Sequence, residues 1–308
     1  MDSARSGPSL IQPLPTLPLD PPASQPRRGL AALLAAALTV PATATPFFAM
    51  SYGFTDLTPA EQTAWLADAG YEGIAVHVWN DELFARLEQT FASAAVASGR
   101  LRVFGVYFPY SLTNPAHRPL ASRLLRLCQP HGTPLWITVQ APGATDVNVI
   151  ALLRELADEA TVHDLEVIYY PHDNHHCLDA EHAHRLITTA DRPNLFNSLH
   201  LHQELRAGHA HRLAEVVARV LPRVRLVSLS GANLPDRINR GANDWNDVVQ
   251  PLTGSPYDVA GFYGLLAQSG YTGPVGVQNW KIPGDPREHH AASLRLLRQW
   301  RTSLSTQP

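Results

Sequence analysis

Short apolar runs rich in β-branched and aromatic residues alternate with longer runs of helical spacing along most of the chain, from Pro46 onward. We expect strands at residues 47–53, 73–79, 101–108, 135–140, 165–170, 195–199, 225–230 and 275–280. We expect helices to begin near Thr58, Asp81, Pro115, Asp146, Asp179, His209, Tyr257 and Pro286. Strands that alternate with helices in this way predict a parallel sheet joined by crossover helices.

The number of these units decides the predicted architecture. Eight strand–helix units in about 260 residues have the size and spacing of a (β/α)8 barrel. A doubly wound sheet has fewer strands and usually a glycine-rich turn after the first one, and residues 52–56 contain no such turn. The predicted fold is therefore α/β, a (β/α)8 TIM barrel formed by residues 45–308.

The N-terminal segment has a different composition. Seven prolines fall within residues 8–26, and two arginines, the uncharged run 29–40 and small residues ending at Ala44 follow them. This order is typical of an export signal, so we expect residues 1–44 to be a disordered leader that is cleaved after Ala44. The protein is then exported to the periplasm or the extracellular space; without a functional signal it is cytoplasmic. The apolar run is too short for a stable membrane span.

Composition and charge narrow the class of partner. Hydrophobic residues make up 45% of the chain and charged residues 17%, as in a globular protein with a sizeable core. The formal net charge is −3, whereas nucleic-acid-binding domains usually carry a basic excess, so no nucleic acid partner is expected. Cys128 and Cys177 are the only cysteines, which excludes a disulfide scaffold and a four-cysteine zinc module. We expect them to lie at opposite faces of the barrel as free thiols.

The predicted barrel locates the active site, because such barrels carry their chemistry at the C-terminal ends of the strands. The polar and aromatic residues at those ends are Asp56, His77, Trp79, Tyr107, Tyr110, Gln140, Tyr170, His172, Asn197, His200, Ser230, Asn233, Gln278 and Lys281. Six of them are predicted to surround one pocket: Tyr170, His172, Asn197, His200, Ser230 and Gln278.

Four segments around these strand ends resemble a known family. They read YYPHDNHHCLDAEHA, NLFNSLHLH, VSLSGAN and PLTGSPYDVAGFYGLLAQSGYTGPVGVQNWKIPGD. They are similar to the sugar phosphate isomerase/epimerase family with the xylose-isomerase-like barrel, which also includes zinc endonucleases of abasic-site repair. The resemblance extends over residues 47–300, is most specific in the last segment, and is greatest to exported members with degenerate metal ligands.

The resemblance implies a metal that the residues themselves do not support. Metal-dependent members hold one divalent ion with Glu, Asp, His and Glu from strands five to eight. These positions fall here at Tyr170, at Asn197, near Ser230 and at Gln278. Amides carry no charge and cannot act as a general base, so charge neutralisation and carboxylate proton transfer are both lost. The cofactor is therefore left open: a divalent metal is implied by the family, but its carboxylate ligands are missing.

Histidines offer another source of chemistry, since nine of the fifteen lie within residues 172–211. His172 and His200 are our predicted catalytic residues, because an imidazole with a pKa near 6.5 serves as general acid or base. Any tight metal site is expected to use His172 and His200 with His175 or His77, and to prefer Zn²⁺. The helical histidines are expected to be solvated: His182, His184, His209 and His211.

Other strand-end residues are predicted to bind substrate. Each amide supplies a donor and an acceptor for neighbouring sugar hydroxyls, and aromatic rings stack on sugar faces. The predicted substrate-binding residues are Tyr170, Asn197, Ser230, Gln278, His77, Trp79 and Lys281. Lys281, the only lysine of the chain, fits either a Schiff-base role or a plain surface position. Asp258 is expected to cap the helix before strand eight.

The predicted function is that of a sugar or keto-sugar isomerase or epimerase that transfers a proton next to a carbonyl, with a small-molecule sugar as substrate. One alternative is a lyase or hydrolase of oxidised (3-keto) glycosides, which enolises the same way and then expels a leaving group. Another is a non-catalytic carbohydrate-binding barrel. An abasic-site endonuclease is disfavoured, because the charge does not attract DNA and the carboxylates of a zinc cluster are missing.

Overall fold

The structure is a computed structural model that describes residues 45–54, 56–239 and 245–305. The predicted leader, residues 1–44, lies outside the described residues. None of the helices in the described ranges is long and apolar enough to cross a membrane.

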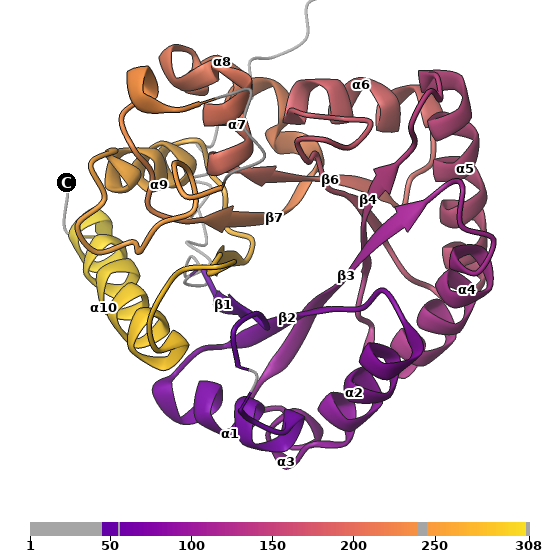
Figure 1. Cartoon of the computed structure of the whole chain (residues 1–308), viewed down its shortest axis with the longest axis horizontal. Helices are drawn as coiled ribbons and strands as arrows, with labels where there is room; N and C mark the ends of the chain where they lie inside the picture. Colours follow the sequence, from indigo (N-terminus) through magenta and orange to yellow (C-terminus); the bar gives the residue numbers. More distant parts are fainter. Residues whose placement is uncertain (1–44, 55, 240–244, 306–308) are drawn as a thin grey trace, which may run out of the picture. The chain divides into compact units, whose positions relative to one another are not determined.

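Eight parallel strands form a closed barrel in chain order, as predicted (Figure 1). They are β1 (Phe47–Met50), β2 (Gly73–His77), β3 (Arg102–Ser111), β4 (Leu135–Gln140), β5 (Val167–Tyr169), β6 (Leu195–His200), β7 (Val224–Leu229) and β8 (Val275–Val277). Pairing of β1 with β8, for example Phe48 with Gly276, closes the ring. Five of the predicted strands end later than the observed ones, because the chain leaves the ladder at the rim to form loops.

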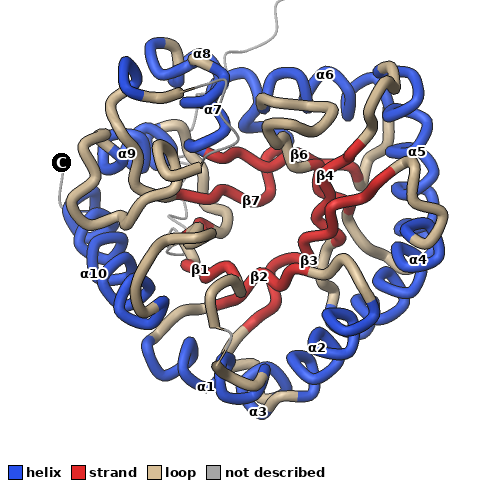
Figure 2. The backbone as a smooth tube through the Cα atoms, in the orientation of Figure 1, coloured by secondary structure: helices blue, strands red, loops and turns tan. Residues whose placement is uncertain are grey.

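A ring of helices surrounds the strands (Figure 2). They are α1 (Pro59–Ala69), α2 (Asp81–Ala92), α3 (Ala94–Ala97), α4 (His117–Cys128), α5 (Asp146–Val162), α6 (Ala180–Ala190), α7 (Leu201–Ala207), α8 (Leu213–Val220), α9 (Val259–Gln268) and α10 (Pro286–Ser305). Short 3-10 helices are η1 (Gln129–His131), η2 (His209–His211), η3 (Leu221–Arg223) and η4 (Pro235–Arg237).

Capping residues set several helix starts where the sequence predicts them. Thr58 and Glu61 form a reciprocal capping box at α1. Asp258 caps α9, where its carboxylate accepts from the backbone N–H of Gly261 at 2.8 Å.

The connection after β6 differs from the prediction. The sequence suggests a loop and a helix near His209, but β6 continues directly into α7, whose first six residues are all buried. The first turn of α7 thereby brings His202 to the barrel mouth, and Gln203 hydrogen-bonds the β5–α6 loop, where its side-chain oxygen accepts from Asp173 N.

The barrel interior is filled below the mouth. Inward rings of Phe48, Phe104 and Trp136 pack together, and a Cβ added to Gly276 would lie only 2.2 Å from the Phe48 ring. A second, larger core lies between strands and helices. Cys128 and Cys177 are buried free thiols, as expected. Because the interior is packed, a ligand can enter only at the rim.

Candidate active site

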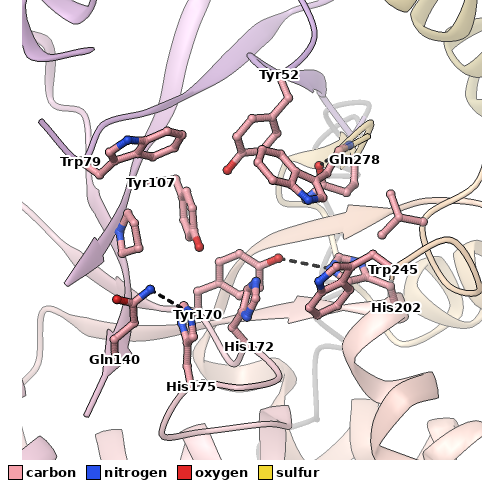
Figure 3. Close-up of a pocket in the computed structure, with 13 residues that line it drawn as sticks. Tyr52, Trp79, Tyr107, Gln140, Tyr170, His172, His175, His202, Trp245 and Gln278 are labelled. Carbon is pink, nitrogen blue, oxygen red and sulfur yellow. Dashed lines mark hydrogen bonds between the residues drawn. The ribbon is translucent and has the colours of Figure 1, made fainter. Parts of the chain in front are cut away.

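A cavity of about 220 Å³ opens at the C-terminal ends of the strands (Figure 3). Aromatic and polar side chains share its surface, as is usual for small-molecule sites. The lining residues are Tyr52, Trp79, Tyr107, Pro109, Gln140, Tyr170, His172, His175, His202, Trp245, Val249, Gln278 and Trp280.

His172 is held so that one ring nitrogen is available to a ligand. Its Nδ1–H donates to the backbone oxygen of Asp173 at 2.6 Å, so Nε2 carries the lone pair. No described residue hydrogen-bonds Nε2. The ring stacks on His175 at 4.3 Å and packs against Trp245 at 5.0 Å, both between centroids. Burial lowers the pKa of His172 to about 4, so the imidazole is neutral near pH 7 and its Nε2 is unprotonated.

Tyr170 and His202 form a buried polar pair on the cavity wall. The hydroxyl of Tyr170 lies 3.2 Å from Nε2 of His202, whose Nδ1 is buried without a partner. Burial lowers the pKa of His202 to about 3 and raises the pKa of Tyr170, although hydrogen bonds to Gln203 and Gln278 oppose the latter shift. Both groups are therefore neutral near pH 7, and the Tyr170 hydroxyl keeps a proton to donate.

His200, a predicted catalytic residue, lies beneath the cavity instead of on its surface. Its Nδ1 hydrogen-bonds the Ser228 hydroxyl at 2.5 Å and its Nε2 the Ser198 hydroxyl at 2.8 Å. The ring stacks under Tyr170 at 3.8 Å between centroids and is fully buried. With both nitrogens occupied and no exposure, His200 supports Tyr170 and has no free atom for a substrate.

His175 lines the cavity but also has both nitrogens occupied. Nδ1 lies 2.8 Å from the Thr138 hydroxyl, and Nε2 lies 3.2 Å from the amide nitrogen of Gln140. Because an amide nitrogen can only donate, Nε2 is the acceptor and Nδ1 carries the hydrogen. Burial lowers the pKa of His175 to about 3, so its role is to support the His172 ring.

Gln278 faces the cavity as predicted, but its side-chain oxygen is already hydrogen-bonded within the protein. Its side-chain oxygen accepts from the backbone N–H groups of Asn279 at 3.0 Å and Trp280 at 3.2 Å. These bonds orient the amide, whose NH2 group donates one hydrogen to the Tyr170 hydroxyl and keeps the other for a ligand. Gln278 is therefore placed to bind an oxygen and not to neutralise a cation.

His77 and Trp79 form part of an aromatic stack at the rim. The His77 ring lies between Tyr52, at 4.4 Å, and Trp79, at 4.8 Å between centroids. Trp79 is 39% exposed and lines the cavity, whereas His77 faces a neighbouring hollow. Its Nδ1 lies 2.6 Å from the Ser51 hydroxyl, and burial lowers the pKa of His77 to about 4. His77 thus orients the rings of Tyr52 and Trp79.

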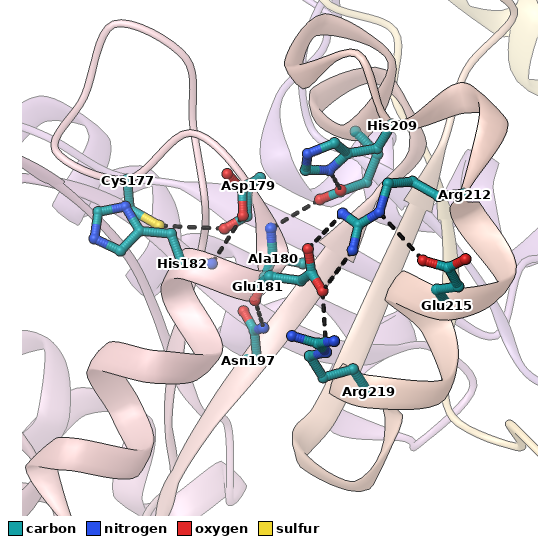
Figure 4. Close-up of polar contacts among 11 residues, drawn as sticks. Cys177, Asp179, Ala180, Glu181, His182, Asn197, His209, Arg212, Glu215 and Arg219 are labelled. Atoms are coloured by element: carbon teal, nitrogen blue, oxygen red, sulfur yellow. Dashed lines mark hydrogen bonds and ion pairs between the residues drawn. The ribbon is translucent and has the colours of Figure 1, made fainter.

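Besides His77, three further predicted substrate-binding residues lie away from the cavity. Asn197 points outward between β6 and α6, and its amide nitrogen donates to Ala180 O at 2.9 Å (Figure 4). Ser230 is buried, and its hydroxyl donates to Val248 O at 2.7 Å. Lys281 is an exposed residue in the left-handed region, with φ 55°, and its ammonium lies 5.5 Å from the Trp280 ring, beside the neighbouring hollow. The prediction that six residues surround one pocket is wrong for Asn197, His200 and Ser230, and Lys281 fits its surface alternative.

The residues present do not fit the family's divalent metal. At its position the inward groups are Tyr170, His200 and Gln278, all neutral, and both nitrogens of His200 are occupied. Without a carboxylate, nothing offsets the cost of desolvating the ion. The predicted site of His172, His200 and His175 is also not formed: within the described residues, three ligand atoms converge only at Asp146, His176 and His182.

Several cavity residues were missed by the sequence analysis. His202 and Tyr52 follow β6 and β1, where the strand-end rule could have found both. Trp245 comes from the long β7–α9 connection, which has no periodicity to indicate where its side chains point. Its indole also covers the guanidinium of Arg206, at 4.5 Å.

Comparison with solved structures shows what this fold resembles. A xylose isomerase domain-containing protein from Salmonella typhimurium LT2 has 16% identity and a TM-score of 0.67, over 83% of this chain and 98% of that one. The 3-keto-D-glucoside 4-epimerase of E. coli has 16% identity and a TM-score of 0.65, over 83% and 99%. D-allulose 3-epimerase from Methylomonas sp. in complex with D-allulose has 16% identity and a TM-score of 0.59, over 83% and 97%.

No curated protein matches the sequence. The sequence model of the xylose isomerase-like TIM barrel family matches residues 63–300, which include seven of the eight strands. With the closed eight-stranded barrel, this match shows that the chain belongs to the xylose isomerase-like TIM barrel family.

Proposed function

We propose that the protein is a sugar or keto-sugar isomerase or epimerase that moves a proton next to a carbonyl, with His172 as the base. The observation that carries the proposal is the state of this imidazole. It is neutral, its Nδ1–H is held by Asp173 O, and its Nε2 has no partner among the described residues. A base with an oriented lone pair in a small cavity is suited to abstract a carbon-bound proton.

The same wall provides a hydrogen-bond donor for the oxygen that becomes negative. When Nε2 of His172 takes the proton from the carbon beside the carbonyl, the C–H electrons form the carbon–carbon double bond of an enediolate. The carbonyl oxygen gains the charge and accepts a hydrogen bond from Tyr170, whose hydroxyl His202 orients. For an isomer, the proton of the adjacent hydroxyl moves to the former carbonyl oxygen, and His172 returns its proton to the former carbonyl carbon. For an epimer, solvent protonates the original carbon from the opposite face, and His172 releases its proton to solvent.

The cavity lining suits a sugar. Rings of Trp79, Tyr107 and Trp280 offer surfaces on which a sugar ring can stack, and Gln140 and Gln278 add amide groups to the same wall. Two proteins with the same fold are named as epimerases of a keto-glucoside and of D-allulose, which supports a keto-sugar as the substrate class.

Deuterium uptake tests the proposal. Purified protein is incubated in D2O with a panel of ketoses and 3-keto-glucosides, and exchange at the carbon beside the carbonyl is followed by NMR. We expect uptake with the wild type, loss of at least about 100-fold with His172→Gln, and no change with His211→Gln, an exposed control.

Two results contradict the proposal. Saturable sugar binding with no exchange from any member of the panel indicates a carbohydrate-binding barrel. Release of the aglycone from a 3-keto-glucoside indicates elimination, the lyase alternative.

A further inference from the structure

Three potential metal ligands converge on the rim outside the cavity. Asp146 is the first residue of α5, His176 lies in the β5–α6 loop, and His182 is in the first turn of α6. The Nε2 atoms of His176 and His182 lie 2.8 and 3.1 Å from the same Asp146 oxygen, Oδ1. One ligand atom from each residue lies within 4.8 Å of the other two.

The spacing matches a tetrahedral ion. Donors on a tetrahedral zinc are about 3.3 Å apart, because each lies about 2.0 Å from the ion. The two observed N···O distances are close to this donor–donor spacing. Small rotations of the side chains therefore bring all three donor atoms to bonding distance from one ion. A carboxylate and two imidazoles favour Zn²⁺ over Mg²⁺, which prefers six oxygens.

The ligands are held by contacts that do not depend on a metal. The backbone N–H of His176 donates to Val139 O of β4 at 3.0 Å. The start of α6 is fixed at several points (Figure 4). The backbone N–H of His182 donates to the Asp179 carboxylate at 2.8 Å, and that of Ala180 donates to the buried carboxylate of Glu204 at 2.8 Å. This preorganisation lowers the entropy cost of ligation.

We propose that Asp146, His176 and His182 form a binding site for a divalent transition-metal ion of the zinc type, with solvent as fourth ligand. The Asp146 side chain is 55% exposed, which leaves one side of the site open to water. Neither Nδ1 of the two histidines has a hydrogen-bond partner among the described residues. Because such second contacts strengthen metal ligation, the expected affinity is micromolar and not nanomolar.

Binding at this site would stiffen the segment that carries His172. The backbone N–H of His172 donates to Cys177 O at 2.6 Å, so His172 and the ligand His176 lie in one hydrogen-bonded loop. An ion would tie this loop to α5 and α6. The site contains no cavity residue, so its existence does not depend on the proposed isomerase activity.

The test uses chelator-treated full-length protein without a sugar. Titration with Zn²⁺ is followed by calorimetry, and titration with Co²⁺ by visible absorption, which reports tetrahedral coordination. We expect one ion per chain, a rise in melting temperature with Zn²⁺ and none with Mg²⁺. His182→Gln keeps a hydrogen-bond donor beside Asp146 but should weaken Zn²⁺ binding by about 100-fold. Asp146→Asn should also weaken it, while His211→Gln should bind as the wild type does.

Other outcomes overturn the site. They are Zn²⁺ binding weaker than millimolar, and binding that both His182→Gln and Asp146→Asn leave unchanged. Circular dichroism of each variant confirms folding, so loss of binding is not mistaken for loss of structure.

Discussion

The hydroxyl of Tyr170, after β5, lies 3.2 Å from Nε2 of His202, in the first turn of α7. The pair joins two consecutive βα units across the cavity wall, with His200 stacked beneath. Each member is buried and neutral, so the pair offers a positioned hydrogen-bond donor without a charge.

Removal of this donor should slow the chemical step. We expect Tyr170→Phe to lower kcat for deuterium exchange by roughly 100-fold to 1000-fold with a smaller change in KM, as when one oxyanion donor is lost. Tyr110→Phe is a matched control, because Tyr110 packs against His117 outside the cavity. Equal losses in both variants would argue against a specific role for Tyr170.

The pH profile should report a base with a lowered pKa. Burial lowers the pKa of His172 to about 4, so its lone pair is available above that value and lost below it. We expect kcat/KM to be level between about pH 5.5 and 8 and to fall as the pH drops through about 4, with circular dichroism confirming that the fold persists. A fall centred near 6.5 would contradict this assignment of the base.

Stability should decrease in acid partly because of His290, which is buried against Phe54 and Tyr71. Burial lowers the pKa of His290 to about 3, whereas the unfolded imidazole titrates near 6.5. The unfolded chain therefore takes up the proton first, so the contribution of His290 is complete above pH 6.5 and declines as the pH falls toward 3. Urea unfolding of His290→Gln from pH 7.5 to 4.5 should show a shallower pH dependence than the wild type. Identical slopes would contradict the prediction.

The family's metal position should remain without a tightly bound Mg²⁺ or Mn²⁺ ion. The inward groups at the family's metal position are neutral, so no Mg²⁺ or Mn²⁺ should bind there with more than weak affinity. The measurement is calorimetric titration of the chelator-treated His182→Gln variant with Mg²⁺ or Mn²⁺. In this variant the proposed site at Asp146, His176 and His182 does not contribute to binding. Tight Mg²⁺ or Mn²⁺ binding that Gln278→Ala abolishes would show that amide ligands suffice.

A carboxylate restored at Asn197 should cost stability without creating metal affinity. In Asn197→Asp the bond to Ala180 O is lost and a charge is buried against a carbonyl, so we expect about 3 kcal/mol or more of destabilisation in urea unfolding. The side chain faces α6, so Mg²⁺ affinity should not rise. Ser122→Ala in α4 is the control variant, and its free energy of unfolding should change much less.

The misplacement of Asn197 has a geometric cause. The resemblance places a family ligand at Asn197, three residues before the strand-end residue His200, but alternate residues of a strand face opposite sides. In β6 the inward residues are Ser198 and His200, so Asn197 faces the helices. A register shift between Asn197 and Ser198 accompanies this arrangement. The family resemblance therefore did not indicate which residues of this strand face the barrel mouth.

The sequence by itself determined the architecture and where the chemistry would be found. Apolar periodicity, the capping box at Thr58 and the count of eight units are local features, and local features specify strands and helices in order. The rule that parallel barrels carry function at strand ends then pointed to Tyr170, His172 and Gln278, which do line the cavity.

Only the tertiary structure decided which atoms are free to act. The roles of His172, His175 and His200 differ because their nitrogens meet different partners, on Asp173, Thr138 and Ser228. The meeting of Asp146 with His182 likewise depends on two helices packing side by side. Such contacts join positions that are distant or oppositely facing in the sequence, and no periodicity records them, because they form only when the barrel closes.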